Sequence, residues 1–335
     1  MTYRVVQWTT GMIGREAVHG ILAHPELELV GCYAHSPEKV GCDVGELCGI
    51  EPIGVSATSD VDALLALDPD CVTYMPYSPD FDHVVRILES GVNIVTTLYM
   101  LSGWGNGDDV RDRIRGAAER GGASLLAGGI YPGHANNVAM ALSAMCARVD
   151  CISLLESLEL SSYENEKMFR IMGFDGVVGD PAVVEMAEAT NGSFKDMVRV
   201  MAHEMGVELD EVRFDVEFAA ADRTLDFGYM TIGEGRIAGI KGVVSGVVDG
   251  VPRFRCGFAW AMGDEMTPSW PITHGYSIEI TGDPDVRGTF SRVDTAVGGE
   301  LTTAMPVVNA IPDVCAAPPG VVNFHALPYV KAAMR

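Results

Sequence analysis

The sequence predicts an α/β fold, with a Rossmann-type doubly wound parallel sheet followed by a second, α+β domain that contains a largely antiparallel sheet. In about the first 135 residues, β-branched apolar runs alternate with segments of helical periodicity. Further on, long segments alternate polar and apolar residues between turn sequences such as Asp249-Gly250. The length of 335 residues also favours two domains over one.

The first domain is expected to begin with a strand at residues 3–8, a glycine-containing turn and a helix that ends before Pro25. The same cycle repeats along the chain. Further strands are expected at 27–34, 70–75, 93–99 and 123–129, and helices at 61–67, 81–91 and 109–122. This order is typical of parallel strands joined by crossover helices.

The pattern changes after a helix expected at 134–147. A helical stretch around 181–206 is followed by segments of period-two alternation at 212–227, 235–262, 275–283 and 286–294. We therefore assign a Rossmann-type domain to residues 1–135 and an α+β domain to residues 136–300. Residues 301–335 are expected to return to the Rossmann domain.

Composition excludes several classes of partner. The formal net charge is −23 with a pI near 4.6, which would repel a nucleic-acid backbone. Eight cysteines without a C-x-x-C pair indicate reduced thiols of a cytoplasmic protein. We expect no targeting segment and no membrane span, because the chain has neither a basic leader nor a long uncharged apolar run. No cluster has metal-ligand spacing, so no metal is expected.

Residues 6–14, VQWTTGMIG, resemble a dinucleotide fingerprint in which Thr9 replaces the first glycine. Gly11 and Gly14 supply the other two glycines, which allow close approach of the pyrophosphate and packing of the helix on the strand. Thr9 is compatible with this turn if its backbone angles are ordinary. The expected cofactor contacts are Thr9, Thr10, Gly11, Met12, Ile13 and Gly14.

The end of the second strand indicates which dinucleotide binds. An NAD site usually has an acid there for the ribose 2′-hydroxyl, whereas an NADP site offers cations or hydroxyls to the 2′-phosphate. This chain has His35, Ser36 and Lys39, with Glu38 displaced into the next turn. NADP is favoured and NAD is the alternative. The same residues also fit a polar surface turn with no ligand.

The loops after the next two strands should lie on the nicotinamide side of the crevice. They contribute Met75, Pro76, Tyr77 and Thr97 as expected cofactor contacts, although strand ends are equally used for packing.

Several segments together resemble the dihydrodipicolinate-reductase-like group, which includes 2,4-diaminopentanoate dehydrogenase and the native amine dehydrogenases. They are the amino-terminal stretch, GVNIVTT, PGHANN, MGFD and TTAMPVVNAIP, and they cover nearly the whole chain. The resemblance implies a homodimer in which NAD(P)H reduces a carbonyl or imine, with a substrate pocket supplied by the α+β domain. It also suggests that Asn309 reaches the nicotinamide amide.

The chain departs from this group just after the strand at 93–99. The resemblance places a catalytic Glu there, but this sequence has Tyr99 and Met100, and no Glu between Glu89 and Glu119. A carboxylate stabilises a cationic iminium, whereas a phenol mainly donates a hydrogen bond to a developing alkoxide. We therefore expect Tyr99 to orient or protonate the reduced atom, the alternative being an aromatic pocket wall.

Two further residues are candidates for catalysis. His134 follows the strand at 123–129, where an imidazole can face the crevice or simply cap a helix. Tyr163 and Lys167 match Y-x-x-x-K of short-chain dehydrogenases, but they lie outside the nucleotide domain. By resemblance, Tyr163 instead lines the substrate pocket.

The expected function is an NADP-preferring oxidoreductase acting on a small, largely apolar carbonyl or imine. One alternative is a true amine dehydrogenase in which Glu156, Glu159 or Glu164 replaces the missing acid. The other is a non-catalytic NADP-binding protein.

Overall fold

The computed structural model describes residues 2–104, 107–293 and 299–333. The chain forms two compact units, one from Met1–His134 with Val297–Arg335 and the other from Ala135–Ala296. The first contains a parallel sheet and the second a mostly antiparallel sheet, which confirms the predicted fold class.

The sheet of the first unit has the strand order β16-β6-β5-β4-β1-β2-β3. Its strands are β1 (Tyr3–Trp8), β2 (Leu27–Tyr33), β3 (Ala57–Thr58), β4 (Cys71–Tyr74), β5 (Asn93–Thr96), β6 (Ser124–Ala127) and β16 (Gly320–Val322). All the pairs are parallel. β1 pairs with β2 on one side and β4 on the other, so the strand order reverses at β1, where such sheets bind ligands beyond the carboxyl ends of the strands.

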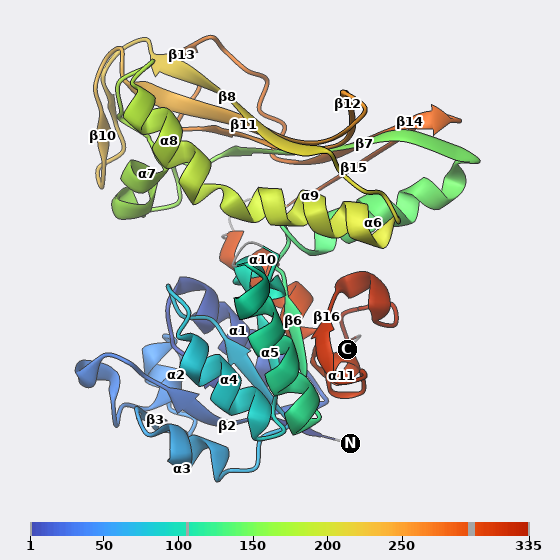
Figure 1. Cartoon of the computed structure of the whole chain (residues 1–335). Coiled ribbons are helices and arrows are strands. Elements are labelled where there is room, and N and C mark those ends of the chain that lie inside the picture. Colours follow the sequence, from blue (N-terminus) through green and yellow to red (C-terminus); the bar gives the residue numbers. More distant parts are fainter. Residues whose placement is uncertain (1, 105–106, 294–298, 334–335) are drawn as a thin grey trace. The chain divides into compact units, whose positions relative to one another are not determined.

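Helices cover both faces of this sheet (Figure 1). One apolar core lies under α1 (Met12–Ala23), α10 (Gly299–Val308) and α11 (Ile311–Cys315). The other lies under α3 (Val61–Leu65), α4 (Phe81–Glu89) and α5 (Asp108–Gly121). Burial on both faces explains why β4 and β6 are apolar without alternation. Shorter elements are α2 (Val44–Leu47), η1 (Pro37–Lys39), η2 (Tyr99–Ser102) and η4 (Phe324–Ala326).

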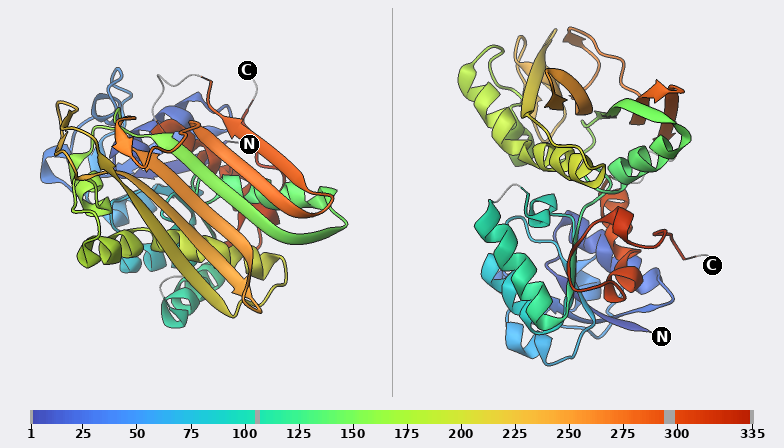
Figure 2. Two further views of the ribbon diagram at one scale, coloured as in Figure 1. Left: turned by 90° about the horizontal axis from the view of Figure 1, so that it is seen from above. Right: turned by 45° about the vertical axis from the view of Figure 1, so that its right-hand side comes forward.

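The main sheet of the second unit has the order β13-β8-β11-β12-β7-β14-β15 (Figure 2). The strands are β7 (Arg148–Glu159), β8 (Glu211–Ala221), β11 (Ile237–Val248), β12 (Val251–Ala261), β13 (Met266–Thr267), β14 (Gly275–Asp283) and β15 (Val286–Ser291). β7 and β12 run parallel, and the other neighbours are antiparallel. A small hairpin adds β9 (Leu225–Asp226) and β10 (Thr231–Ile232).

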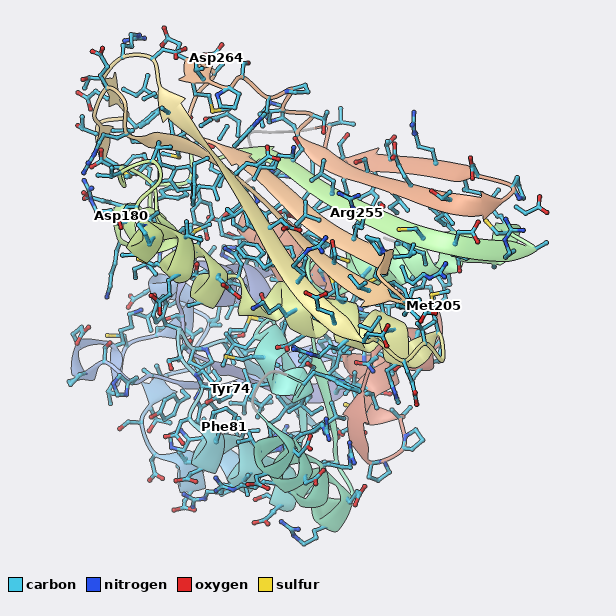
Figure 3. The ribbon with its side chains drawn as sticks, turned by 45° about the horizontal axis from the view of Figure 1, so that its top comes forward. Tyr74, Phe81, Asp180, Met205, Arg255 and Asp264 are labelled. Atoms are coloured by element: carbon cyan, nitrogen blue, oxygen red, sulfur yellow. The ribbon has the colours of Figure 1, made fainter. Side chains whose placement is uncertain are left out.

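Helices cover one face of this second sheet (Figure 1). They are α6 (His134–Leu142), α7 (Glu166–Met172), α8 (Pro181–Thr190) and α9 (Gly192–Glu204), with η3 (Ser143–Met145) after α6. Asp180 precedes α8 and Met205 follows α9, and the two helices run along the sheet between them (Figure 3). Phe194 of α9 packs on Phe258, with ring centroids 5.1 Å apart.

The helical stretch expected at 181–206 is divided at Asn191, whose side-chain amide donates to the Ala187 carbonyl at the end of α8. That bond ends one helix and lets the next begin. Among the residues described here, no helix is long and apolar enough to cross a bilayer.

Candidate functional site

A cavity of about 460 Å³ opens at the carboxyl edge of the parallel sheet. It is surrounded by the ends of β1, β2 and β4, which is where the strand order reverses. The lining residues are Trp8, Thr9, Thr10, Gly11, Tyr33, Ala34, His35, Ser36, Lys39, Tyr74, Met75, Pro76, Tyr77, Ser78, Asp80 and His83. Most of the polar residues expected to bind a dinucleotide are therefore gathered in one place.

The turn after β1 corrects one expectation. Thr9 was considered compatible with the turn if its backbone angles were ordinary, but its φ is +71°, in the left-handed region that glycine normally occupies. Thr9 therefore adopts the backbone of the missing fingerprint glycine rather than avoiding it. Its hydroxyl donates to the Met75 carbonyl at 2.9 Å, which ties the turn to the loop after β4.

The two remaining glycines have different reasons for lacking a side chain. A Cβ at Gly14 would lie 2.4 Å from the Thr9 carbonyl oxygen, so α1 can approach the turn only with glycine there. A Cβ at Gly11 would meet nothing within 4 Å, which leaves that space to a ligand. Gly11 caps α1 without a side-chain hydrogen bond, so the first amides of α1, at Met12 and Ile13, remain available for an anion.

The end of β2 presents polar and cationic groups. His35, Ser36 and Lys39 line the cavity, and the lining residues of the loop directly after β2, at 34–39, carry no carboxylate. The Lys39 ammonium lies 3.2 Å from the Thr10 carbonyl oxygen and 3.3 Å from the Thr10 hydroxyl. A positive charge is thus held beside the glycine turn, where it can contact a phosphate.

Aromatic side chains form the inner wall of the cavity. Trp8 stacks on Tyr33 with ring centroids 4.2 Å apart, and both rings meet the imidazole of His83 edge-on. Tyr74, at the end of β4 near the start of α4 at Phe81, has its hydroxyl bonded to the main chain of Asp80 (Figure 3). Burial raises the pKa of Tyr74 to about 12, so its phenol stays protonated.

Sequence reasoning missed the residues of this inner wall, which are Trp8, Tyr33, Tyr74, Asp80 and His83. The signal was present, because each aromatic is the last residue of its strand. Terminal strand residues at this edge face the ligand crevice in doubly wound sheets.

Met75, Pro76 and Tyr77, which were predicted as cofactor contacts, line the cavity, and Tyr77 is 81% exposed. Thr97 follows β5 and is not among the lining residues, so the structure does not gather it with them. Tyr99 begins η2, directly after β5, and is buried. Thr97 and Tyr99 therefore lie at the same edge of the sheet as the cavity but beyond its lining.

His134 also lies at this edge, after β6. Its imidazole packs edge-on against Phe324, which follows β16, and its Nδ1 atom is buried with no hydrogen-bond partner in the described structure. Burial lowers the pKa of His134, which keeps the ring neutral near pH 7. A neutral imidazole with an unsatisfied nitrogen can donate or accept one hydrogen bond.

Two further predicted residues are not among those that line the cavity. Tyr163 belongs to the second unit, where its ring packs against Phe169. Asn309 follows α10, one residue after Val308, and Val308 packs beside Gly20 in the middle of α1. Asn309 is not among the lining residues.

The acids considered as replacements for the missing Glu are already engaged or exposed. Glu156 is buried and accepts hydrogen bonds from Tyr276 at 2.6 Å and Trp260 at 2.8 Å. Burial raises the pKa of Glu156, and these two bonds lower it in part. Glu159 accepts from the main-chain amides of Ser161 and Gly263, and Glu164 is exposed.

The structure shows no group of acids, histidines and cysteines arranged to hold a metal within its described ranges. All eight cysteines are free thiols. The glycine turn, the open helix terminus and the Lys39 ammonium instead fit a dinucleotide. Together with the doubly wound sheet, they define a pyridine-nucleotide-dependent dehydrogenase or reductase.

Comparison with known proteins specifies the family. Residues 135–335 match the 2,4-diaminopentanoate dehydrogenase C-terminal domain, and residues 5–96 match the N-terminus of dihydrodipicolinate reductase. An amine dehydrogenase of Streptomyces virginiae is 31% identical over 98% of this chain and 97% of its own. The chain therefore belongs to the 2,4-diaminopentanoate dehydrogenase and amine dehydrogenase family, as the sequence predicted.

Comparison with a more distant relative and with a solved structure gives a consistent result. A 4-hydroxy-tetrahydrodipicolinate reductase of Synechococcus elongatus is 37% identical over 27% of this chain and 36% of its own. The solved amine dehydrogenase of Mycobacterium smegmatis covers 99% of this chain and 98% of its own, with a TM-score of 0.80 at 21% identity. That structural likeness confirms the two-domain fold.

Proposed function

We propose that this protein is an NADP-preferring oxidoreductase that transfers hydride to a small, largely apolar carbonyl or imine. The observation that carries the NADP preference is Lys39, bonded to Thr10 at the turn after β1, together with His35 and Ser36 where an NAD site would have an acid. The ammonium and hydroxyl groups would neutralise and bind the 2′-phosphate.

The protein's own residues divide the work of binding the cofactor. Thr9, Thr10 and Gly11 shape the turn, and the first amides of α1 receive the pyrophosphate. Met75, Pro76 and Tyr77 line the same cavity as Lys39, and we infer that the exposed Tyr77 ring would pack on the ligand. When bound, NADPH supplies the hydride.

We assign the part of the site where the substrate meets the nicotinamide to the loops after β5 and β6. The Tyr99 hydroxyl would donate a hydrogen bond to the oxygen or nitrogen that gains negative charge. His134 would hold the same atom, or the nicotinamide amide, through its unsatisfied Nδ1. Tyr163 is proposed to line the substrate pocket of the second domain, and this domain to form a homodimer.

Reductive amination with ammonia is the second candidate, favoured by the full-length likeness to the Streptomyces virginiae amine dehydrogenase. Against it stand Tyr99 and Met100 at the expected place of the acid, and Glu156, whose carboxylate is held by Tyr276 and Trp260. A preformed imine or a ketone needs no ammonium-binding carboxylate, so simple reduction is the first candidate.

Two measurements test this proposal. Titration of the protein with NADPH and NADH, followed by nicotinamide fluorescence, should give at least tenfold tighter binding of NADPH. Oxidation of NADPH should then be followed with a panel of small ketones, aldehydes and cyclic imines, with and without ammonium. Turnover independent of ammonium supports the first candidate, and turnover that requires it supports the second. Binding without turnover on the whole panel would indicate a non-catalytic NADP-binding protein.

A further inference from the structure

Thr9 is the junction of three segments at the cavity. Its main-chain N–H donates to the Tyr33 carbonyl of β2 at 2.9 Å. Its carbonyl accepts from the Gln7 side-chain amide at 2.8 Å, and its hydroxyl donates to the Met75 carbonyl at 2.9 Å. Every polar group of this residue is therefore bonded, and each to a different partner.

The choice of threonine here needs an explanation. The left-handed backbone of Thr9, with φ of +71°, suits glycine and is strained for a β-branched residue. Glycine would adopt this turn without strain, but it has no hydroxyl to bond to Met75. The hydroxyl is thus the feature that threonine adds at this position.

Two fully buried side chains, those of Gln7 and Thr73, support the strained turn through hydrogen bonds. The Thr73 hydroxyl of β4 donates to the Gln7 Oε1 atom at 2.5 Å, and the Gln7 Nε2 amide donates onward to the Thr9 carbonyl. Both Gln7 and Thr73 are completely inaccessible to solvent. Neither lines the cavity, so any effect they have on a ligand must pass through Thr9 and the loops.

We propose that Thr9, Gln7 and Thr73 form a latch that fixes the loop after β4, residues 75–78, against the turn after β1 before the cofactor binds. Thr9 and Met75 both line the cavity, and the Thr9 hydroxyl adds a second bond between these two walls to the one that the Met75 N–H donates to the Trp8 carbonyl at 3.2 Å. Preorganised walls lower the ordering cost of binding. Gln7 and Thr73 are positioning residues in this scheme, which rests on the proposed function only for the identity of the ligand.

The test compares Thr9→Gly, Thr9→Ser and Gln7→Met with the wild-type chain. Thr9→Gly removes both the backbone strain and the hydroxyl, whereas Thr9→Ser keeps the hydroxyl. Gln7→Met removes the side-chain amide and keeps the approximate size of the side chain, which does not line the cavity. Hydrogen exchange of peptides covering residues 74–80 is measured without ligand, and the Kd for NADPH is measured by fluorescence. We expect exchange about fivefold or more faster in Thr9→Gly and Gln7→Met, with Kd raised about fivefold, and near wild-type values in Thr9→Ser.

Ser124→Ala is the matched control. The Ser124 hydroxyl is also buried and donates to a main-chain oxygen, that of Pro318, but it lies at the first residue of β6, at the opposite edge of the sheet. This variant should lower the melting temperature and leave both loop exchange and Kd unchanged.

Unchanged exchange at residues 74–80 in Thr9→Gly and Gln7→Met would overturn the latch. Faster exchange with an unchanged Kd for NADPH would also overturn it, because the bonds would then order the loop in the wild-type chain without affecting cofactor binding. If the wild-type chain binds neither NADPH nor NADH, the proposed function fails, while the exchange measurement still decides whether the latch exists.

Discussion

The Lys39 ammonium lies 3.2 Å from the main-chain oxygen of Thr10 and 3.3 Å from its hydroxyl. Both acceptors belong to the turn that receives the pyrophosphate in a Rossmann site. The side chain is thus placed between the glycine turn and the end of β2, which is the position that distinguishes NADP from NAD.

Replacement of Lys39 by Ala should weaken NADPH binding about tenfold, because a charge-assisted bond to the 2′-phosphate is lost. Binding of NADH should change by less than about twofold, since it has no phosphate there. Fluorescence titrations with both cofactors at low and high salt measure this selectivity. Equal losses for the two cofactors would mean that Lys39 only stabilises the turn.

Substitutions at the two glycines of the turn should distinguish an effect on folding stability from an effect on cofactor binding. Gly14→Ala places a Cβ 2.4 Å from the Thr9 carbonyl oxygen and 3.0 Å from the Gln7 amide, so overpacking should cost about 2 kcal/mol of folding stability. Gly11→Ala meets no neighbour within 4 Å and should fold normally, yet it should bind NADPH weakly, because its methyl group would occupy space left for the ligand. Urea unfolding and cofactor titration of both variants measure the two effects. Equal stability of the two variants would contradict the packing argument.

Tyr99→Phe tests the proposed proton donor. Tyr99 is buried directly after β5, so the change removes one hydroxyl and keeps the ring. If the hydroxyl serves the reduced atom, kcat should fall about a hundredfold while the Kd for NADPH stays within twofold. Steady-state NADPH oxidation and a binding titration measure these quantities. Full turnover in the variant would leave Tyr99 as a wall of the pocket.

The sequence predicted the parallel sheet and the glycine turn because both depend on local patterns. Alternating apolar runs determined the strands, and Gly11 and Gly14 marked the start of α1. It could not predict the left-handed backbone of Thr9, because one supporting bond comes from Met75, in the loop after β4, and another from Gln7, which is itself held by Thr73. Contacts between residues far apart in sequence require the strand order.

The same limit applies to the candidate acids. Nothing in the local sequence around Glu156 shows that its carboxylate is bonded to Tyr276, 120 positions away. By contrast, Lys39 was predictable, since it follows the end of β2 within the same short loop.

A buried acid in the second unit gives a pH-dependent prediction. Asp196 of α9 is 3% exposed, and burial raises its pKa to about 6 although the Arg199 guanidinium, 3.4 Å away, lowers it in part. A raised pKa means that the folded state favours the protonated acid. The stability that this acid contributes is therefore present at low pH and lost as the pH rises from about 4 toward 6.

Asp196→Asn should accordingly be more stable than the wild-type chain above pH 6, by roughly 1–3 kcal/mol, because the amide carries no charge to desolvate. The difference should be smaller at pH 5 than at pH 7.5. Urea unfolding at these two pH values measures it, with Asp215→Asn, on the exposed face of β8, as a control that should show little change. A variant less stable than the wild-type chain at pH 7.5 would mean that the ion pair with Arg199 outweighs the cost of burying the charge.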